Sequence, residues 1–392
     1  MALRAISVPI TTKGSVMKKS AFILAIISLL VGAFGAIALT EAGQMINMPR
    51  EWVFSYFEYR VALNVFIVAL AVVAIYLLLK GSLLGKKWIG LYGIAIVACL
   101  FFINVFAPEF WLRAQQYGAE FMSVEQANQK LSDDSDVFVL EINGDARAYP
   151  RDWMQLPHIV GDKIGGQETV MTYCALSNLP VAFNPKMNGQ ETDFRVIAQV
   201  HNNLIFTDRN SGELIQQVTG TAEYSQTQLQ QYPVQRMTWQ AFKSLYPKGQ
   251  VFNYKPNAFD QLTLKLFDTA LIPHYEGVAM FPTLNEPDPR VESGEQIWGV
   301  TIDGKSIAVT QSHFDKQQQF VAHLPAQDVL FVQYPEFDTV AAYLVDNSRN
   351  WQQVNVDPYG KYDGGQLSRA NLYSGMPWMI WSHWFPESEI YQ

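Results

Sequence analysis

Three long apolar segments constrain the fold of this chain more than any other feature. Residues 21–40, 61–79 and 88–107 each run for about 20 residues without Asp, Glu, Lys, Arg or His. A helix of that length spans the roughly 30 Å hydrocarbon core of a bilayer. The sequence therefore predicts a three-helix transmembrane region over residues 21–107, preceded by a cytoplasmic N-terminus over residues 1–20.

Basic residues beside these segments indicate their orientation. They precede the first segment or fill the loop between the second and third: Lys13, Lys18, Lys19, Lys80, Lys86 and Lys87. Because cytoplasmic loops carry an excess of Lys and Arg, we expect an inner-membrane protein whose C-terminal part is extracytoplasmic. The first segment also imitates a secretory signal peptide, and its cleavage would leave the other two orientations unchanged.

The uneven distribution of charge narrows the classes of partner. Residues 1–107 carry a net charge of +6, so the rest of the chain carries −14. An acidic domain repels phosphate backbones, which argues against nucleic acid as a partner. The expected partners are the lipid bilayer and an envelope protein. A transporter is disfavoured because the apolar segments contain no ionisable Asp, Glu, Lys, Arg or His.

The polar part contains two similar hairpin patterns. Residues 137–142 and 145–149 are strand-like and are joined by Asn143-Gly144, a turn pair that tolerates positive φ. The same pattern recurs 160 residues later around Asp303-Gly304, which suggests an internal duplication or a repeated structural role. We expect a helical connector over residues 108–132, followed by a mostly β (α+β) domain over residues 133–392.

Candidate chemistry centres on three residues. His158 has the chemistry of a metal ligand or an acid–base group, and equally of a structural histidine. Cys174 suits a thiolate ligand or nucleophile, or a small buried apolar residue. Asp208 opens Asp208-Arg209-Asn210-Ser211-Gly212, which is first of all a turn sequence. No phosphate loop, Gly-x-Ser-x-Gly or His-Glu-x-x-His motif occurs, so no catalytic activity is assigned.

Several ordered motifs carry a family resemblance. They are Asp145-Ala146-Arg147-Ala148-Tyr149-Pro150, His158, Thr172-Tyr173-Cys174, residues 204–212 and the closing Trp381-Ser382-His383-Trp384-Phe385-Pro386. Over roughly residues 137–392 the chain resembles the prokaryotic family catalogued as domain of unknown function 3179. Members typically carry Tyr-Cys-Pro-Leu-Cys, and the resemblance implies that these cysteines and the upstream His form a metal or redox site. Here Ser177 replaces the second Cys, which removes dithiol chemistry and weakens a transition-metal site at His158 and Cys174.

Three functional hypotheses follow from the sequence. The first in rank is a membrane-anchored extracytoplasmic module of the cell envelope that binds a partner or takes part in assembly. The second is a metal- or cofactor-binding redox or thiol protein that uses His158 and Cys174, with Asp208 as a further candidate. In the third, residues 1–107 are a helix-packing subunit of a larger membrane complex.

Overall fold

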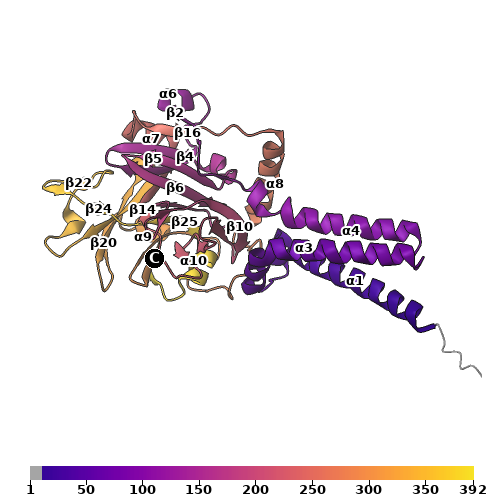
Figure 1. The fold of residues 1–392 in the computed structure, drawn as a ribbon. Coiled ribbons are helices and arrows are strands. Elements are labelled where there is room, and N and C mark those ends of the chain that lie inside the picture. Colours follow the sequence, from indigo (N-terminus) through magenta and orange to yellow (C-terminus); the bar gives the residue numbers. More distant parts are fainter. Residues whose placement is uncertain (1–10) are drawn as a thin grey trace, which may run out of the picture. The chain divides into compact units, whose positions relative to one another are not determined.

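The three uncharged segments form helices, and two of these helices begin about ten residues before the segments predicted from the sequence. The computed structural model describes residues 11–392 and divides into two compact units, one that ends at Phe110 and one that covers Trp111–Gln392. The helices of the first unit are α1 (Thr11–Ala38), α2 (Glu41–Met45), α3 (Arg50–Lys80) and α4 (Lys86–Asn104). Among the described residues, three of these helices are long and apolar enough to cross a membrane, and they lie side by side (Figure 1).

Small and polar side chains join the three long helices. Asn64 of α3 donates to the side chain of Asn104 of α4 at 2.8 Å, and Ser28 of α1 hydrogen-bonds Tyr92 of α4 at 2.6 Å. A Cβ at Gly35 of α1 would lie 2.1 Å from the ring of Tyr56, so α1 and α3 approach closely only because this position lacks a side chain. Small residues at close contacts and hydrogen bonds between polar side chains are features that helix pairs in membranes also use.

The segment 108–132 differs from the helical connector that the sequence predicts. It forms α5 (Pro108–Trp111), β1 (Ala114–Gln115), β2 (Phe121–Ser123) and α6 (Val124–Ala127). The backbone of Arg113 and Gly118 has positive φ, which interrupts a helix. The strands then find partners, because β1 pairs with β5 and β2 with β16. The predicted continuous helix is therefore wrong, because strand pairing with distant parts of the chain determines the structure of this segment.

The second unit is mostly β, as the sequence predicts, and its strands form two repeats of one topology. The first repeat consists of a hairpin, a three-stranded meander and a β-α-β return: β3 (Asp136–Ile142), β4 (Asp145–Pro150), β5 (Ile159–Ile164), β6 (Gln167–Cys174), β7 (Leu179–Phe183), β15 (Val234–Thr238), α7 (Trp239–Leu245) and β16 (Gln250–Phe252). The second has the same order: β17 (Gln296–Ile302), β18 (Lys305–Thr310), β19 (Gln319–His323), β20 (Asp328–Tyr334), β21 (Thr339–Val345), β25 (Tyr373–Pro377), α10 (Trp378–Trp384) and β26 (Glu389–Tyr391).

Strand register confirms the repetition of the hairpins and extends it well beyond them. In the first meander Ile159 pairs with Thr172, and in the second Gln319 pairs with Val332. Both residues of the second pair follow their counterparts in the first by 160 positions. In the returns, β16 pairs in parallel with β4 and β26 pairs in parallel with β18. We infer an internal duplication, because two independently assembled sheets would not share both the strand order and the residue-by-residue register.

Other elements are inserted within and between the repeats. Within the first repeat lie β8 (Lys186–Met187), β9 (Gln190–Glu191), β10 (Phe194–Val200), β11 (Asn203–Asp208), β12 (Leu214–Gln216), β13 (Thr221–Ala222) and β14 (Gln231–Tyr232). Between the repeats lies α8 (Ala258–Tyr275), and within the second lie α9 (Gln311–Phe314), β22 (Lys361–Tyr362), β23 (Gly365–Gln366) and β24 (Ser368–Arg369).

Aromatic residues at the start of each return helix bury its inner face. The rings of Trp239 and Phe242 in α7 and those of Trp378 and Trp381 in α10 are fully buried. The tryptophans of α10 thus cover one helical face, and α7 begins at a cap in which the Thr238 side chain accepts a hydrogen bond from the amide of Ala241. These helices hold the β15 and β25 strands that line the site described next.

Candidate functional site

His158 is a buried residue beside Tyr173. The Tyr173 amide donates to the His158 carbonyl at 2.9 Å, and the two rings lie 6.5 Å apart. Both ring nitrogens of His158 are buried without a hydrogen-bond partner. Burial lowers the pKa of His158 to about 4, so the ring is neutral at pH 7.

Cys174 ends β6, one residue after Tyr173. Successive side chains of a strand point to opposite faces, so the Cys174 thiol points away from the face that Tyr173 shares with His158. Its Sγ lies 4.0 Å from the carbonyl of Asn202, and burial raises the pKa of the thiol. Ser177 is also buried, in the turn between β6 and β7. The pairing of His158 and Cys174 as metal ligands stays a prediction.

Asp208 stabilises a turn. Its carboxylate accepts hydrogen bonds from the amides of Asp193, Asn210 and Ser211 at 2.8 to 3.1 Å, and from the Ser211 hydroxyl at 2.6 Å. These bonds close the β11–β12 turn, which confirms the turn interpretation. Within residues 11–392, no group of three or more His, Cys, Asp or Glu side chains is arranged to hold a metal ion. The described geometry thus gives no support to the expected metal site.

Burial of His158 predicts a dependence of stability on pH. Because its pKa is about 4 in the folded chain and about 6.5 in an unfolded one, the unfolded state binds more protons between these values. The free energy of unfolding should fall as the pH drops from 6.5 towards 4, with His158 contributing about 2 kcal/mol of that loss at pH 4.5. Urea unfolding at pH 7 and pH 4.5 measures it.

The variant for this test is His158→Leu, which should reduce the loss of stability on acidification. If the free energy of unfolding depended on pH identically in the wild type and in His158→Leu, the burial of His158 would not cause the loss of stability.

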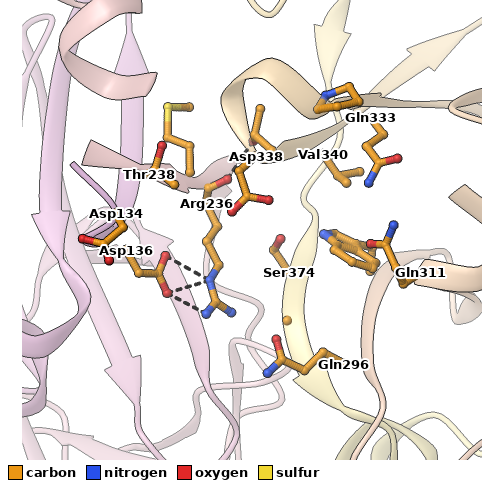
Figure 2. A pocket seen from close by; sticks show the side chains of 15 residues that line it. Asp134, Asp136, Arg236, Thr238, Gln296, Gln311, Gln333, Asp338, Val340 and Ser374 are labelled. Atoms are coloured by element: carbon orange, nitrogen blue, oxygen red, sulfur yellow. Dashed lines mark hydrogen bonds and ion pairs between the residues drawn. The ribbon is translucent and has the colours of Figure 1, made fainter. Parts of the chain in front are cut away.

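A polar pocket of about 300 Å³ lies where the two repeats meet, and we call it the Arg236 pocket (Figure 2). On the side of the first repeat, the Arg236 guanidinium forms a double ion pair with Asp136, with Nε–Oδ2 and Nη2–Oδ2 distances of 2.8 and 2.6 Å. The side of the second repeat contributes amides, a hydroxyl, a carboxylate and an indole: Gln296, Gln311, Gln333, Ser374, Asp338 and Trp298.

A β-bulge at Gly375 makes room for Arg236. The pairing of β17 with β25 shifts between Ile297 and Trp298, which leaves Gly375 unpaired with φ of +81°. A Cβ on Gly375 would lie 1.9 Å from Nη1 of Arg236. The equivalent pairing of β3 with β15 is regular, so the bulge distinguishes the second repeat from the first. Bulges commonly redirect side chains next to functional sites.

In the first repeat, the residues that correspond to three lining residues of the Arg236 pocket form hydrogen bonds with one another. At the offset of 160, Gln311 corresponds to Arg151, Gln333 to Tyr173 and Asp338 to Asn178. Arg151 donates to Asn178 at 3.1 Å, and Tyr173 donates to the same Asn178 oxygen at 3.1 Å. The Asn178 amide in turn donates to the carbonyl of Gly375 at 2.9 Å. The duplication thus retains an internally bonded polar cluster in one repeat and an open pocket in the other.

A second pocket adjoins the first. Gln296, Trp298 and Gln311 line both, and the second pocket, of about 550 Å³, adds Glu276, Glu292 and Glu295. We call the two together the acidic groove. Its lining carries six carboxylates, counting Asp134, Asp136 and Asp338, against the single guanidinium of Arg236. An anionic ligand is therefore disfavoured, because like charges in a concave site repel it.

Sequence reasoning missed Asp136, Arg236 and the three glutamines, because none belongs to a recognisable motif. The available signal was the offset of 160 between the hairpins, which relates Asp136 to Gln296 and Arg151 to Gln311. Comparing the two repeats at this offset beyond the hairpin strands would have shown charged residues, Asp136 and Arg151, in the first repeat where the second has glutamines.

Comparison with known proteins gives one match. No curated protein and no solved structure matches the chain. The profile of a family described as "Protein of unknown function (DUF3179)" matches residues 117–388, which is most of the chain and nearly all of its β domain. This agrees with the motifs from which the resemblance was inferred. The chain therefore belongs to the DUF3179 family, with a membrane-type three-helix region preceding the family domain.

Proposed function

We propose that this protein is a membrane-anchored, extracytoplasmic binding module of the cell envelope, and that its acidic groove holds an extended, positively charged segment of a partner protein. The observation that carries this proposal is the combination of carboxylates and side-chain amides along two adjoining pockets.

Charge supports a basic ligand. Arg236 is already paired with Asp136, so the other five carboxylates of the groove face a ligand without a compensating cation in the lining. Lys and Arg side chains form charge-assisted hydrogen bonds with carboxylates. The partly exposed ring of Trp298 offers a cation–π surface in the middle of the groove.

The amides support a peptide. A glutamine side chain both donates and accepts hydrogen bonds, as a backbone peptide group does. Gln296, Gln311 and Gln333 lie around the same cavity, so an extended backbone can exchange hydrogen bonds with them while its basic side chains reach the carboxylates. Adjoining cavities suit an elongated ligand better than a compact one.

Basic residues between α3 and α4 support an extracytoplasmic location of the β domain. Lys80 ends α3, and Lys86 and Lys87 begin α4, so the short loop between the two helices is strongly basic. The positive-inside rule places this loop in the cytoplasm and residue 105 onward on the opposite side. Protease digestion of intact spheroplasts tests this topology, since an extracytoplasmic domain is cleaved without lysis.

Isothermal titration of the detergent-purified full-length protein tests the binding proposal. The probes are a nine-residue peptide of alternating lysine and alanine, a glutamate–alanine peptide of equal length, and maltotriose. We expect the lysine peptide alone to bind, and its affinity to fall about tenfold between 20 and 500 mM NaCl because the attraction is screened.

Two single substitutions locate the binding. Glu292→Gln removes a groove carboxylate and should weaken the lysine peptide severalfold, whereas Glu387→Gln removes an exposed carboxylate outside the groove and should not. Preferential binding of the glutamate peptide or of maltotriose would overturn the proposal, as would equal effects of the two substitutions.

A further inference from the structure

Histidine rings hold a segment without regular structure between the two repeats. Residues 278–287 follow α8 and contain no helix or strand. The Met280 amide donates to Nδ1 of His274 at 3.0 Å, and the Asn285 amide donates to Nδ1 of His383 at 3.0 Å. Because each ring accepts a hydrogen bond through Nδ1, each ring is neutral and carries its proton on Nε2.

The turn between β10 and β11 holds the middle of the 278–287 segment. His201 donates from Nδ1 to the carbonyl of Thr283 at 2.6 Å. Asn202 donates to the carbonyl of Phe281 at 3.1 Å and to the Thr283 hydroxyl at 3.2 Å. Phe281 and Thr283 are buried. The segment is therefore fixed by side chains from this turn, from α8 and from α10, and two of these contacts require a neutral imidazole.

Protonation of His383 is unfavourable while the segment is in place. Burial, and then the neighbouring His201, lower the pKa of His383 to about 4. The two rings lie 4.7 Å apart, so a second proton on each would bring two positive charges together. The carboxylates nearest in sequence, Glu286 and Glu387, are exposed. A proton on Nδ1 of His383 would also remove the acceptor of the Asn285 amide.

His274 lies in a similar environment. Burial lowers its pKa, and its Nε2 donates to the Leu176 carbonyl at 2.6 Å, which leaves Nδ1 as the acceptor of the Met280 amide. The ring of Tyr275 lies 5.7 Å away, and the Tyr275 hydroxyl accepts a hydrogen bond from Arg151 at 3.1 Å. Neither the phenol nor the guanidinium compensates a positive charge on His274.

The 278–287 segment adjoins glutamates of the acidic groove. A Cβ on Gly277 would lie 2.8 Å from the amide nitrogen of Gly294, so the backbone before the segment touches the backbone after it. Glu276 and Glu292, which line the groove, lie beside these contacts on the two sides of the segment. Displacement of the segment therefore disturbs the wall of the groove that carries these carboxylates.

We propose that the 278–287 segment is a pH-sensitive switch, which leaves its position when His274 and His383 take up protons and thereby weakens the binding of a basic ligand in the groove. Acidification removes the two Nδ1 acceptors and places positive charge on two buried rings. The released state binds more protons, so release becomes more favourable as the pH falls, while carboxylates of ordinary pKa remain largely ionised at pH 5. The effect on the ligand rests on the proposed function, whereas the release does not.

Hydrogen–deuterium exchange of the detergent-purified full-length protein at pH 7 and pH 5 tests the release. A ring whose pKa rises from about 4 to about 6.5 on release shifts the opening equilibrium about twentyfold between these two pH values. After correction for the intrinsic effect of pH on exchange, the amides of residues 280–286 should exchange at least twentyfold faster at pH 5.

Matched histidine variants separate local release from global unfolding. His383→Asn keeps an acceptor for the Asn285 amide at both pH values and should reduce the acceleration about twentyfold. His274→Asn should act in the same direction. His313 also has a pKa lowered by burial, but its ring packs against Phe320 and Tyr391, so His313→Asn should leave the acceleration unchanged. No acceleration in the wild type, or equal effects of His383→Asn and His313→Asn, would overturn the release.

Titration with the lysine peptide at pH 7 and pH 5 tests the link to the groove. On acidification, the wild type should lose at least twofold more affinity than His383→Asn does. Equal losses together with accelerated exchange would overturn the link to the groove while supporting the release. Absence of peptide binding at pH 7 would overturn the proposed function and this link with it, and the exchange experiment would still decide whether the segment is released.

Discussion

Gly375→Ala is expected to abolish binding of the lysine peptide and to lower the free energy of unfolding by about 3 kcal/mol. About 1 kcal/mol of this comes from placing a Cβ at a φ of +81°. The remainder comes from the Arg236 guanidinium, which a Cβ 1.9 Å away must displace from its double ion pair with Asp136. Urea unfolding followed by tryptophan fluorescence measures the stability, and isothermal titration measures the binding.

The matched control is Gly144→Ala in the first hairpin turn. Gly144 has a φ of +85°, but a Cβ there meets no atom within 4 Å. This variant should therefore lose only the backbone contribution of about 1 kcal/mol and should bind the peptide normally. If the two variants lost equal stability and both retained binding, the bulge would have no role in shaping the pocket.

Asp136→Ala is expected to cost about 2 kcal/mol and to weaken the lysine peptide at least tenfold. Asp136 and Arg236 side chains are only 27% and 22% exposed, and removing one partner of a largely buried pair leaves the other charge uncompensated. The Arg151 guanidinium, 4.0 Å from the same carboxylate, loses part of its compensation as well. An unpaired Arg236 then repels the basic peptide from the pocket.

A double-mutant cycle separates these effects. Arg236→Met keeps much of the side-chain volume and removes the charge, so Asp136→Ala combined with Arg236→Met should be more stable than the sum of the two single losses predicts. Additive losses would contradict a direct coupling between the two side chains. The cycle is measured by the same urea unfolding experiment.

Local features of the sequence predicted the membrane-type helices and the hairpins. An uncharged run of about 20 residues needs no tertiary partner to be recognised, because the bilayer alone determines its required length. The turns were predictable because Asn143-Gly144 and Asp303-Gly304 tolerate the positive φ that all four residues adopt. Family membership was likewise carried by short, ordered motifs.

Long-range pairing limited the prediction elsewhere. The returns of the two repeats are 139 residues apart while the hairpins are 160 apart, so a single offset did not reveal the whole duplication. The segment 108–132 was expected to be helical because its apolar and polar residues are mixed in a pattern that fits a helix, yet β1 and β2 gain partners from distant strands.

The candidate site was missed for the same reason. Asp136 and Arg236 lie 100 residues apart, and each occupies an ordinary strand position. His158 and Cys174 attracted attention through their chemistry, and the structure buries both side chains. Residue type therefore pointed to two side chains that are buried in this domain. The acidic groove is recognised only from the folded structure, because residues of both repeats line it.

Hydrogen–deuterium exchange of the full-length protein with and without the lysine peptide tests the central claim most directly. The account predicts slower amide exchange at residues 134–138, 236–238, 292–298 and 333–340, which surround the acidic groove. Unchanged exchange there, with protection confined to the separate pocket around residues 116–121 and 185–192, would contradict it.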